Sequence, residues 1–255
     1  MLHKFENDWQ GFIRSLATYS RLPVRVDWDS SEKHTPSVCF LPLVGMVVAL
    51  LSAWPLLFDG WSAPFQALLM LLSAVLLTGA FHEDGLMDAC DGLIGGWTPE
   101  QRLTIMKDSR VGSYGVLAGI FCIVGKWWLL SQWLSFGGAG SVLAGWLAVH
   151  ICARWLPVTL MQSLTYVTAG QSKAQSMIDG LDTRCWAWLG ASLMLVLMLV
   201  GVGTLVQIVI ALAVLGVAMR AYLKARIGGF NGDTLGASEQ IAELAVLFVL
   251  LGWSA

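Results

Sequence analysis

Charged residues are scarce in this chain. Asp, Glu, Lys and Arg together make up 13% of its 255 residues, whereas 56% are hydrophobic; soluble globular proteins average about 25% charged residues. The mean hydropathy is +0.69. This shortage of charge excludes an ordinary soluble domain. The net charge of −2 says little about partners; we expect no nucleic-acid partner.

The chain also lacks the usual cysteine motifs and a secretory signal. Its five cysteines show no C-x-x-C spacing, so we interpret them as buried or cytoplasmic thiols without a redox function. Residues 1–20 contain Glu6, Asp8 and Arg14, which would interrupt the apolar core of a secretory signal.

The N-terminal segment instead carries apolar side chains at helical spacing. They are Phe5, Trp9, Phe12, Ile13 and Leu16. A helix with this pattern can lie along the membrane surface or pack against a bundle. The sequence leaves both interpretations open.

Long apolar runs make up most of the chain. They lie near 38–58, 65–81, 111–134, 142–163, 186–219 and 240–254, and about 20 apolar residues span a bilayer. As one helix the fifth run would extend about 51 Å against a hydrocarbon core of about 30 Å, so we divide it at Gly201–Thr204. The sequence predicts an all-α, polytopic transmembrane helical bundle with about seven spans. It forms a single integral membrane domain, 1–255, in which 1–36 is a cytoplasmic or interfacial segment.

Basic residues occur in alternate loops only. Thirteen of the fifteen fall there, whereas 59–64, 135–141 and the turn near Gly201 have none. Cytoplasmic loops of membrane proteins carry such an excess of Lys and Arg. The thirteen are Lys4, Arg14, Arg21, Arg25, Lys33, Arg102, Lys107, Arg110, Lys173, Arg184, Arg220, Lys224 and Arg226. We therefore expect the N-terminus and the polar loops to face the cytoplasm.

An acidic segment follows the second apolar run. Residues 81–92 read Phe-His-Glu-Asp-Gly-Leu-Met-Asp-Ala-Cys-Asp-Gly, with four carboxylates at Glu83, Asp84, Asp88 and Asp91. In a helix Asp84, Asp88 and Asp91 share one face. Such carboxylates repel each other unless a cation lies among them, and oxygen ligands suit Mg²⁺ or Mn²⁺. A solvated, acidic helix start is the simpler alternative.

Two further polar loops belong to the same predicted side. Thr98-Pro99 marks a helix start with Thr as N-cap, and Lys107 and Arg110 follow it. These two cations can hold phosphate, although positive-inside flanking also explains them. Residues 228–239 form a glycine-rich turn and a helix start that can present backbone N–H groups to phosphate.

Four charged residues fall inside or at the edge of the apolar runs. They are Lys126, Arg154, Glu239 and Glu243. Charges within a membrane need partners. We expect Glu239 and Glu243 to face the bundle, Lys126 to reach the interface by snorkelling, and Arg154 to be functional.

Several of these segments resemble the cobalamin synthase family, the membrane-bound adenosylcobinamide-GDP ribazoletransferases. The similar pieces are Ser-Arg-Leu-Pro-Val at 20–24, Phe-Leu-Pro-Leu-Val-Gly at 40–45, and the segments 81–92, 105–115 and 228–237. The acidic segment and Gly-Asp-Thr-Leu-Gly-Ala at 232–237 are the most specific. The resemblance runs nearly from end to end.

The resemblance implies an enzyme of a bacterial inner membrane. It would join adenosylcobinamide-GDP to α-ribazole, or to its 5′-phosphate, and release GMP, with Mg²⁺ or Mn²⁺ as cofactor and the lipid bilayer as its surroundings. The oligomeric state, including a homo-oligomer, is left open. The implied roles are as follows: Glu83, Asp84, Asp88 and Asp91 as metal ligands; Asp91, with His82 in reserve, as proton acceptor; and Lys107, Asp108, Arg110, Arg154 and Asp233 as substrate-binding residues.

Two other classes of membrane protein also contain acidic residues in or near their apolar segments. A CDP-alcohol phosphotransferase also uses spaced aspartates, but its pattern requires Asp-Gly-x2-Ala-Arg, and Asp84-Gly85 here is followed by Leu-Met-Asp-Ala without Arg. A cation transporter would place carboxylates at mid-bilayer and often contains repeated halves, and the sequence has no such repeat.

Overall fold

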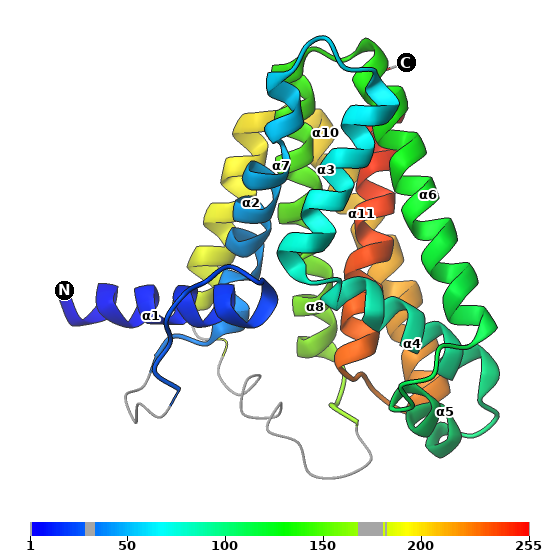
Figure 1. The fold of residues 1–255 in the computed structure, drawn as a ribbon. Coiled ribbons are helices and arrows are strands. Elements are labelled where there is room, and N and C mark those ends of the chain that lie inside the picture. The colour runs from blue at the N-terminus through cyan, green and yellow to red at the C-terminus, as the bar shows by residue number, and fades with distance from the viewer. Residues whose placement is uncertain (1, 29–33, 168–180, 182, 255) are drawn as a thin grey trace.

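The computed structural model describes residues 2–28, 34–167, 181 and 183–254 and is a bundle of helices (Figure 1). The described part contains no β-strand beyond an isolated bridge between Tyr166 and Phe230, so the all-α prediction is confirmed. The elements are α1 (Leu2–Tyr19), η1 (Ser37–Phe40), α2 (Leu41–Ser52), η2 (Trp54–Leu57), α3 (Ala63–Thr78), α4 (Phe81–Gly95), α5 (Pro99–Met106), α6 (Ser113–Phe136), α7 (Ala139–Ala153), α8 (Trp155–Ser163), α10 (Thr183–Ile227) and α11 (Gly232–Ser254).

Five of these helical segments are long and apolar enough to cross a membrane. They are Ser37–Leu57, Ser113–Phe136, Ala139–Ser163, Thr183–Ile227 and Gly232–Gly252, and the bent pair α3 and α4 makes six if it counts as one span. The protein is therefore multi-pass, while the count of seven stays a prediction. The difference depends on α10, whose 45 residues are interrupted at Gly201, where φ is 78° and ψ is 167°.

The polar elements gather at one end of the bundle (Figure 1). Helices α1, α4 and α5 lie there, together with the start of α11. The loops after η2 and after α6 lie at the opposite end and share a groove lined by Asp59, Trp61 and Ser135. The loops with and without basic residues are thus separated as the sequence predicts. Lys33 and Lys173 lie outside the described residues.

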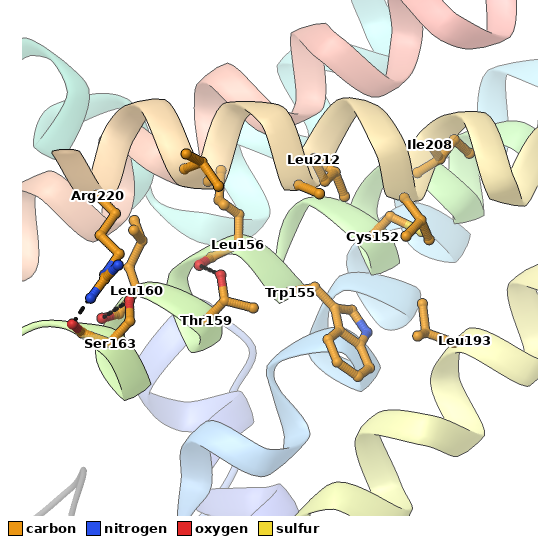
Figure 2. A pocket seen from close by; sticks show the side chains of 14 residues that line it. Cys152, Trp155, Leu156, Thr159, Leu160, Ser163, Leu193, Ile208, Leu212 and Arg220 are labelled. Atoms are coloured by element: carbon orange, nitrogen blue, oxygen red, sulfur yellow. Dashed lines mark hydrogen bonds between the residues drawn. The ribbon is translucent and has the colours of Figure 1, made fainter. Parts of the chain in front are cut away.

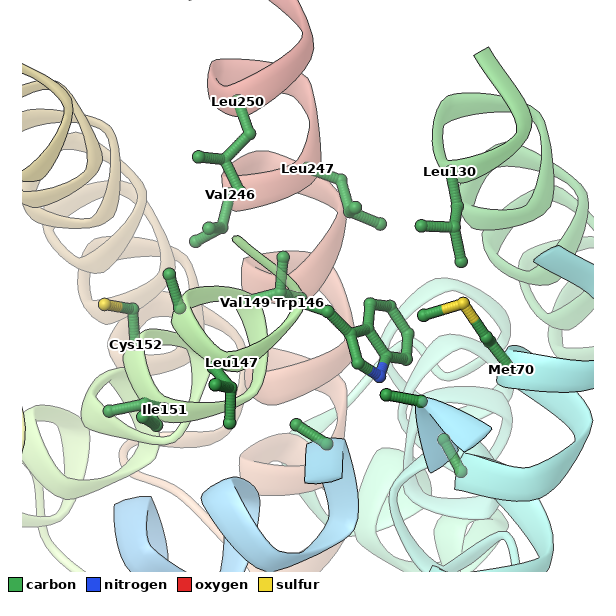
Figure 3. Packing of buried hydrophobic residues seen from close by; sticks show 14 of the residues in the cluster. Met70, Leu130, Trp146, Leu147, Val149, Ile151, Cys152, Val246, Leu247 and Leu250 are labelled. Atoms are coloured by element: carbon green, nitrogen blue, oxygen red, sulfur yellow. The ribbon is translucent and has the colours of Figure 1, made fainter. Parts of the chain in front are cut away.

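Helix α7 supplies the centre of the apolar core, where its residues meet α11, α6 and α3 (Figure 3). The Trp146 side chain is fully buried, and its Nε1 donates a hydrogen bond of 2.8 Å to Ser52 Oγ on α2. This bond satisfies the one polar atom of the indole, as burial of tryptophan requires. Gly45 of α2 lets the two helices approach, because a Cβ there would lie 2.3 Å from the His150 carbonyl oxygen.

A sharp bend between α3 and α4 creates the platform for the acidic segment. The two helix axes differ by 85°, and the two residues between them, Gly79 (φ 67°) and Ala80 (φ 58°), both have left-handed backbone. Glycine adopts this conformation readily, and a Cβ at Gly79 would collide with the Arg21 side chain. Because α4 turns away from the direction of α3, it lies at the end of the bundle, and we treat it as outside the membrane-spanning segments.

Helix α1 lies across that same end and packs against the bundle, one of the two alternatives that the sequence left open. Its C-terminal half packs on the bundle, with Leu16 buried and the Phe12 ring 6.2 Å from that of Phe40, whereas Trp9 is 51% exposed.

The prediction that the cysteines are free thiols is wrong for two of them. Cys39 of η1 and Cys185 of α10 form a disulfide, which a sequence separation of 146 residues without a motif does not predict.

Candidate functional site

The three aspartates of α4 project from one face, as the helical spacing predicts. They differ in burial: Asp84 is exposed, Asp88 is half-buried and Asp91 is 7% exposed. Each therefore meets a different environment. The face as a whole is directed toward the start of α11 and the start of α6.

Two glycines allow α4 to approach the start of α11 closely. A Cβ at Gly85 would lie 3.0 Å from the backbone oxygen of Asp233, and a Cβ at Gly236 would lie 3.2 Å from that of His82. Glycine is needed where two backbones come this close. The contact carries Asp233 to the acidic face of α4.

The start of α11 is stabilised by reciprocal hydrogen bonds. The backbone N–H of Thr234 donates to Asn231 Oδ1 (3.0 Å), and the backbone N–H of Asn231 donates to Thr234 Oγ1 (2.9 Å). Asn231 Nδ2 donates to Asp233 Oδ2 (2.9 Å). The segment at 231–234 therefore caps the helix as a side-chain N-cap does and fixes the direction of the Asp233 carboxylate.

The electrostatics of this face are unfavourable for its own carboxylates. Burial, followed by the charges of Asp84, Asp233 and Asp91, raises the pKa of the Asp88 carboxyl to about 6. Like charges and desolvation both disfavour an ionised carboxylate. A divalent cation among these oxygens would relieve that repulsion.

Asp91 has a structural role that the sequence did not reveal. Its Oδ2 accepts a hydrogen bond from the backbone N–H of Gly112 (2.7 Å), and its Oδ1 accepts one from Gly115 (2.8 Å). These N–H groups belong to the first turn of α6, which lacks intrahelical acceptors for them. Asp91 thus joins α4 to α6 and stabilises the positive end of that helix.

The basic loop lies between α5 and α6. The predicted helix start is confirmed, because Thr98 and Gln101 form a capping box at the start of α5. Arg110 is 88% exposed and its Nη2 lies 2.6 Å from Asp108 Oδ2; this hydrogen bonding lowers the pKa of Asp108 to about 2. Lys107 is exposed and interacts electrostatically with Asp233.

A network of buried charges lies beneath α4, where α11 meets α6 and α7. Glu239 Oε2 lies 2.9 Å from His82 Nε2, and Glu239 Oε1 lies 2.8 Å from Arg154 Nη2. Glu243 Oε2 lies 2.9 Å from Lys126 Nζ. The expectation that both glutamates face the bundle is confirmed, since they are 1% and 3% exposed.

Two further side chains complete this network, and the sequence reading missed both. Glu243 Oε1 lies 3.0 Å from His150 Nδ1, and Lys126 Nζ donates to Gln240 Oε1 at 2.5 Å. The network borders a cavity of about 10 Å³, about the space that one water molecule occupies. The only sequence signal was helical spacing, since His150 lies four residues before Arg154.

The network changes the interpretation of three predicted residues. Lys126 does not snorkel: it is 2% exposed, because Glu243 and Gln240 offer it a partner inside the bundle. Glu83 points toward Lys126 Nζ at 3.9 Å and is not brought to the aspartates. Arg154 is 1% exposed and bound to Glu239. The metal role of Glu83 and the substrate role of Arg154 stay predictions.

Within the described residues, no group of three His, Cys, Asp or Glu side chains converges closely enough to hold a metal ion by itself. The described residues also form an apolar groove. The groove between α8 and α10 has a volume of about 450 Å³. It is lined by aliphatic residues and Trp155, with Arg220 at one end, where its Nε donates to the Ser163 carbonyl (Figure 2).

These features define the class of the protein. It is a multi-pass helical membrane protein that has, at one polar end, carboxylates without strong cationic partners together with Lys and Arg side chains. Comparison with known proteins gives the family. The profile of the family described as cobalamin-5-phosphate synthase matches residues 11–251. The chain belongs to this family and is a transferase of cobalamin biosynthesis.

Curated relatives agree with the family match over nearly the whole chain. The adenosylcobinamide-GDP ribazoletransferase of Shewanella piezotolerans is 36% identical over 251 residues, covering 94% of each chain. That of Shewanella amazonensis is 36% identical and covers 97% of this chain and 96% of its own. That of Shewanella baltica is 37% identical and covers 94% and 93%. No solved structure gives a significant match.

Proposed function

We propose that this protein joins adenosylcobinamide-GDP to α-ribazole, or to α-ribazole 5′-phosphate, and releases GMP. The observation that carries the proposal is the acidic face of α4, held against Asp233 by Gly85 and Gly236. It lies at the same end of the bundle as α5 (Figure 1), and the loop after α5 contains Lys107 and Arg110. The curated relatives carry the name of this activity.

The reaction is a phosphoryl transfer. A ribose hydroxyl attacks the phosphorus that bears the cobinamide, a new P–O bond forms, and the bond to the bridging oxygen breaks. GMP takes that oxygen and the electron pair, and the hydroxyl proton passes to a base. Positioning and neutralisation of charge on the phosphate oxygens provide most of the catalysis in such transfers.

The residues present fit Mg²⁺ by their chemistry. Asp84, Asp88 and Asp233 are carboxylates without a strong cationic partner, and burial together with mutual repulsion raises the pKa of Asp88. Mg²⁺ commonly binds through one or two carboxylates plus substrate phosphates, so an incomplete protein ligand set suits a metal that arrives with a diphosphate. When bound, it would supply charge neutralisation to the diphosphate.

The remaining polar side chains have proposed roles at the same end. Lys107 and Arg110 would bind phosphate oxygens, Arg110 after exchanging its partner Asp108. Asp91 or His82 would accept the hydroxyl proton. Because Asp91 already accepts two backbone N–H groups, its free lone pairs are the ones that point away from α6. Glu83 and Arg154 would then act from below the face, through the buried network.

We further propose that the polar end faces the cytoplasm of a bacterial inner membrane. The thirteen basic residues outside the apolar runs and the positive-inside rule support this orientation. Nucleotides and Mg²⁺ are supplied on that side. A cysteine probe at the exposed position 95 should be shielded from a periplasmic reagent, and probes at the exposed positions 60 and 138 should react.

The direct test is reconstitution. The purified protein in lipid vesicles is incubated with adenosylcobinamide-GDP, α-ribazole and Mg²⁺, and GMP and the cobamide are measured. We expect equal amounts of both, and none of either when α-ribazole or the metal is omitted. Ion flux without GMP release would instead favour the transporter interpretation.

A further inference from the structure

A pocket smaller than the groove between α8 and α10 lies beside the contact between α4 and α11. Its volume is about 200 Å³, and α1, α2, α4, α8 and α11 all contribute to its wall. Pockets for drug-sized ligands are about 300–1,000 Å³. The pocket is therefore too small for a corrinoid or a whole nucleotide, and its size suits a single flat ring system.

Aromatic rings from four separate segments line this pocket. Tyr19 and Phe81 meet edge to face, with centroids 6.0 Å apart, and Tyr166 and Phe230 do the same at 5.5 Å. Each edge-to-face pair uses only one ring face, so an inserted aromatic ring can stack on the others. Phe81 is 46% exposed, whereas Phe230 is 1% exposed, which places Phe81 at the mouth and Phe230 at the base.

The pocket also contains a small number of polar atoms. His82 and Glu239 both line it, and they are joined at 2.9 Å. Tyr19 lies beside them, with its ring nearly parallel to that of His82. Burial and the charge of Glu239 raise the pKa of Tyr19 to about 12, so the phenol keeps its proton and can donate a hydrogen bond. A ligand with one ring nitrogen acceptor suits this arrangement.

The mouth of the pocket lies close to the acidic face of α4. Phe81 precedes Asp84 by one helical turn, about 5 Å along α4, and Gly232, which also lines the pocket, directly precedes Asp233. A ribose attached to a ring inside the pocket would span this distance. Its hydroxyls would then lie at Asp84 and Asp233.

We propose that this pocket binds the aromatic base of the acceptor nucleoside, so that the ribose extends to the acidic face of α4. Ribazole carries a dimethylbenzimidazole, a flat bicyclic ring whose second nitrogen is a hydrogen-bond acceptor. The inference rests on the proposed function. It adds a binding site for one substrate, with Phe81 and Phe230 as stacking surfaces and Tyr19 as the donor.

The test compares Phe81→Ala with Phe121→Ala. Phe121 is a 73% exposed ring on α6 that does not line the pocket, so it is a matched control. Stacking of a base on an aromatic side chain predicts a rise of about tenfold in KM for α-ribazole in Phe81→Ala. KM for adenosylcobinamide-GDP should be unchanged, and Phe121→Ala should change neither. An unchanged KM for α-ribazole in Phe81→Ala would overturn the proposal.

Two further measurements separate this inference from the proposed function. Binding of radiolabelled α-ribazole is measured without the second substrate, and free dimethylbenzimidazole should displace it from the wild-type protein. Tyr19→Phe removes only a hydroxyl, so it should fold and weaken this binding several-fold. If the wild type binds α-ribazole but never releases GMP, the proposed function fails and the pocket stands. If it releases GMP while both variants bind normally, the pocket assignment is wrong.

Discussion

Two groups of charges lie within a few helical turns of each other and are built in opposite ways. On the surface of α4, Asp84 and Asp88 meet further carboxylates and few cations. Beneath it, Glu239 and Glu243 are surrounded by Arg154, Lys126 and two histidines. Unpaired charges at a polar end are available to a ligand, whereas balanced charges inside a bundle hold helices together. The same residue types are therefore proposed to bind a ligand in one place and to stabilise the bundle in the other.

The largest effect should come from removing the surface charges. Asp84→Asn and Asp88→Asn should each reduce turnover by at least about 10³-fold, because a neutral amide cannot balance a divalent cation worth several kcal/mol to the reaction. Both variants should remain folded, since neither carboxylate has a strong structural partner. Turnover is measured as GMP release, with EDTA and added Mg²⁺ as the paired control. Full activity of either variant, or of chelated wild type, would contradict the metal assignment.

Substitution of Asp91 tests whether this carboxylate is a metal ligand or the base that accepts the proton. If it accepts the proton, Asp91→Asn should lower the single-turnover rate by about 10²–10⁴-fold and spare Mg²⁺-dependent affinity for adenosylcobinamide-GDP. Affinity and rate are compared with those of Asp84→Asn. An equal loss of affinity in both variants would make Asp91 a ligand and leave the proton to His82 or Asp233.

Breaking the buried group of charges should destabilise the protein. Arg154→Leu leaves Glu239 and Glu243 short of a cation inside the bundle, and removal of one partner of a buried pair typically costs about 3–5 kcal/mol. Thermal unfolding in detergent is the measurement. Arg220→Leu, which removes an exposed cation, is the control and should shift Tm little. Normal stability of Arg154→Leu would show that the network is not architectural.

The smallest effect concerns the strain stored in the acidic face. The pKa of Asp88 is about 6 in the folded protein, above the ordinary value of about 4, because burial and neighbouring carboxylates disfavour the ionised form. The resulting loss of stability is complete above pH 6 and disappears only as the pH falls from 6 to below about 4. In EDTA, Asp88→Asn should melt about 2–4 °C above wild type at pH 8. The difference should shrink at pH 5 and vanish below about pH 4; a gap of equal size at pH 8 and pH 4 would contradict it.

The sequence predicted the elements well because each was encoded locally. The apolar runs predicted the helices, and Thr98 predicted the start of α5. The alternation of loops with and without basic residues predicted which loops lie at each end of the bundle. The spacing of Asp84, Asp88 and Asp91 gave the acidic face. These features depend on residues within one or two helical turns of each other.

The partners across helices could not be predicted, because they depend on packing. Lys126 has no sequence sign that it meets Glu243, 117 residues later, and the disulfide of Cys39 with Cys185 has none either. The bend at Gly79 and Ala80 was also missed, since alanine rarely adopts left-handed backbone. Without that bend the acidic segment reads as a simple continuation of α3.

Helix α11 follows α6 and α7 in chain order, which has a consequence for biosynthesis. This helix supplies Asp233 to the polar face and Glu239 and Glu243 to Arg154 and Lys126. During translation both cations are therefore placed among apolar helices before their partners have been made, at a cost of a few kcal/mol each. The buried charges are balanced only after α11 has been inserted, so a chain that stops before residue 232 has neither the counter-ions of Lys126 and Arg154 nor its fourth site aspartate.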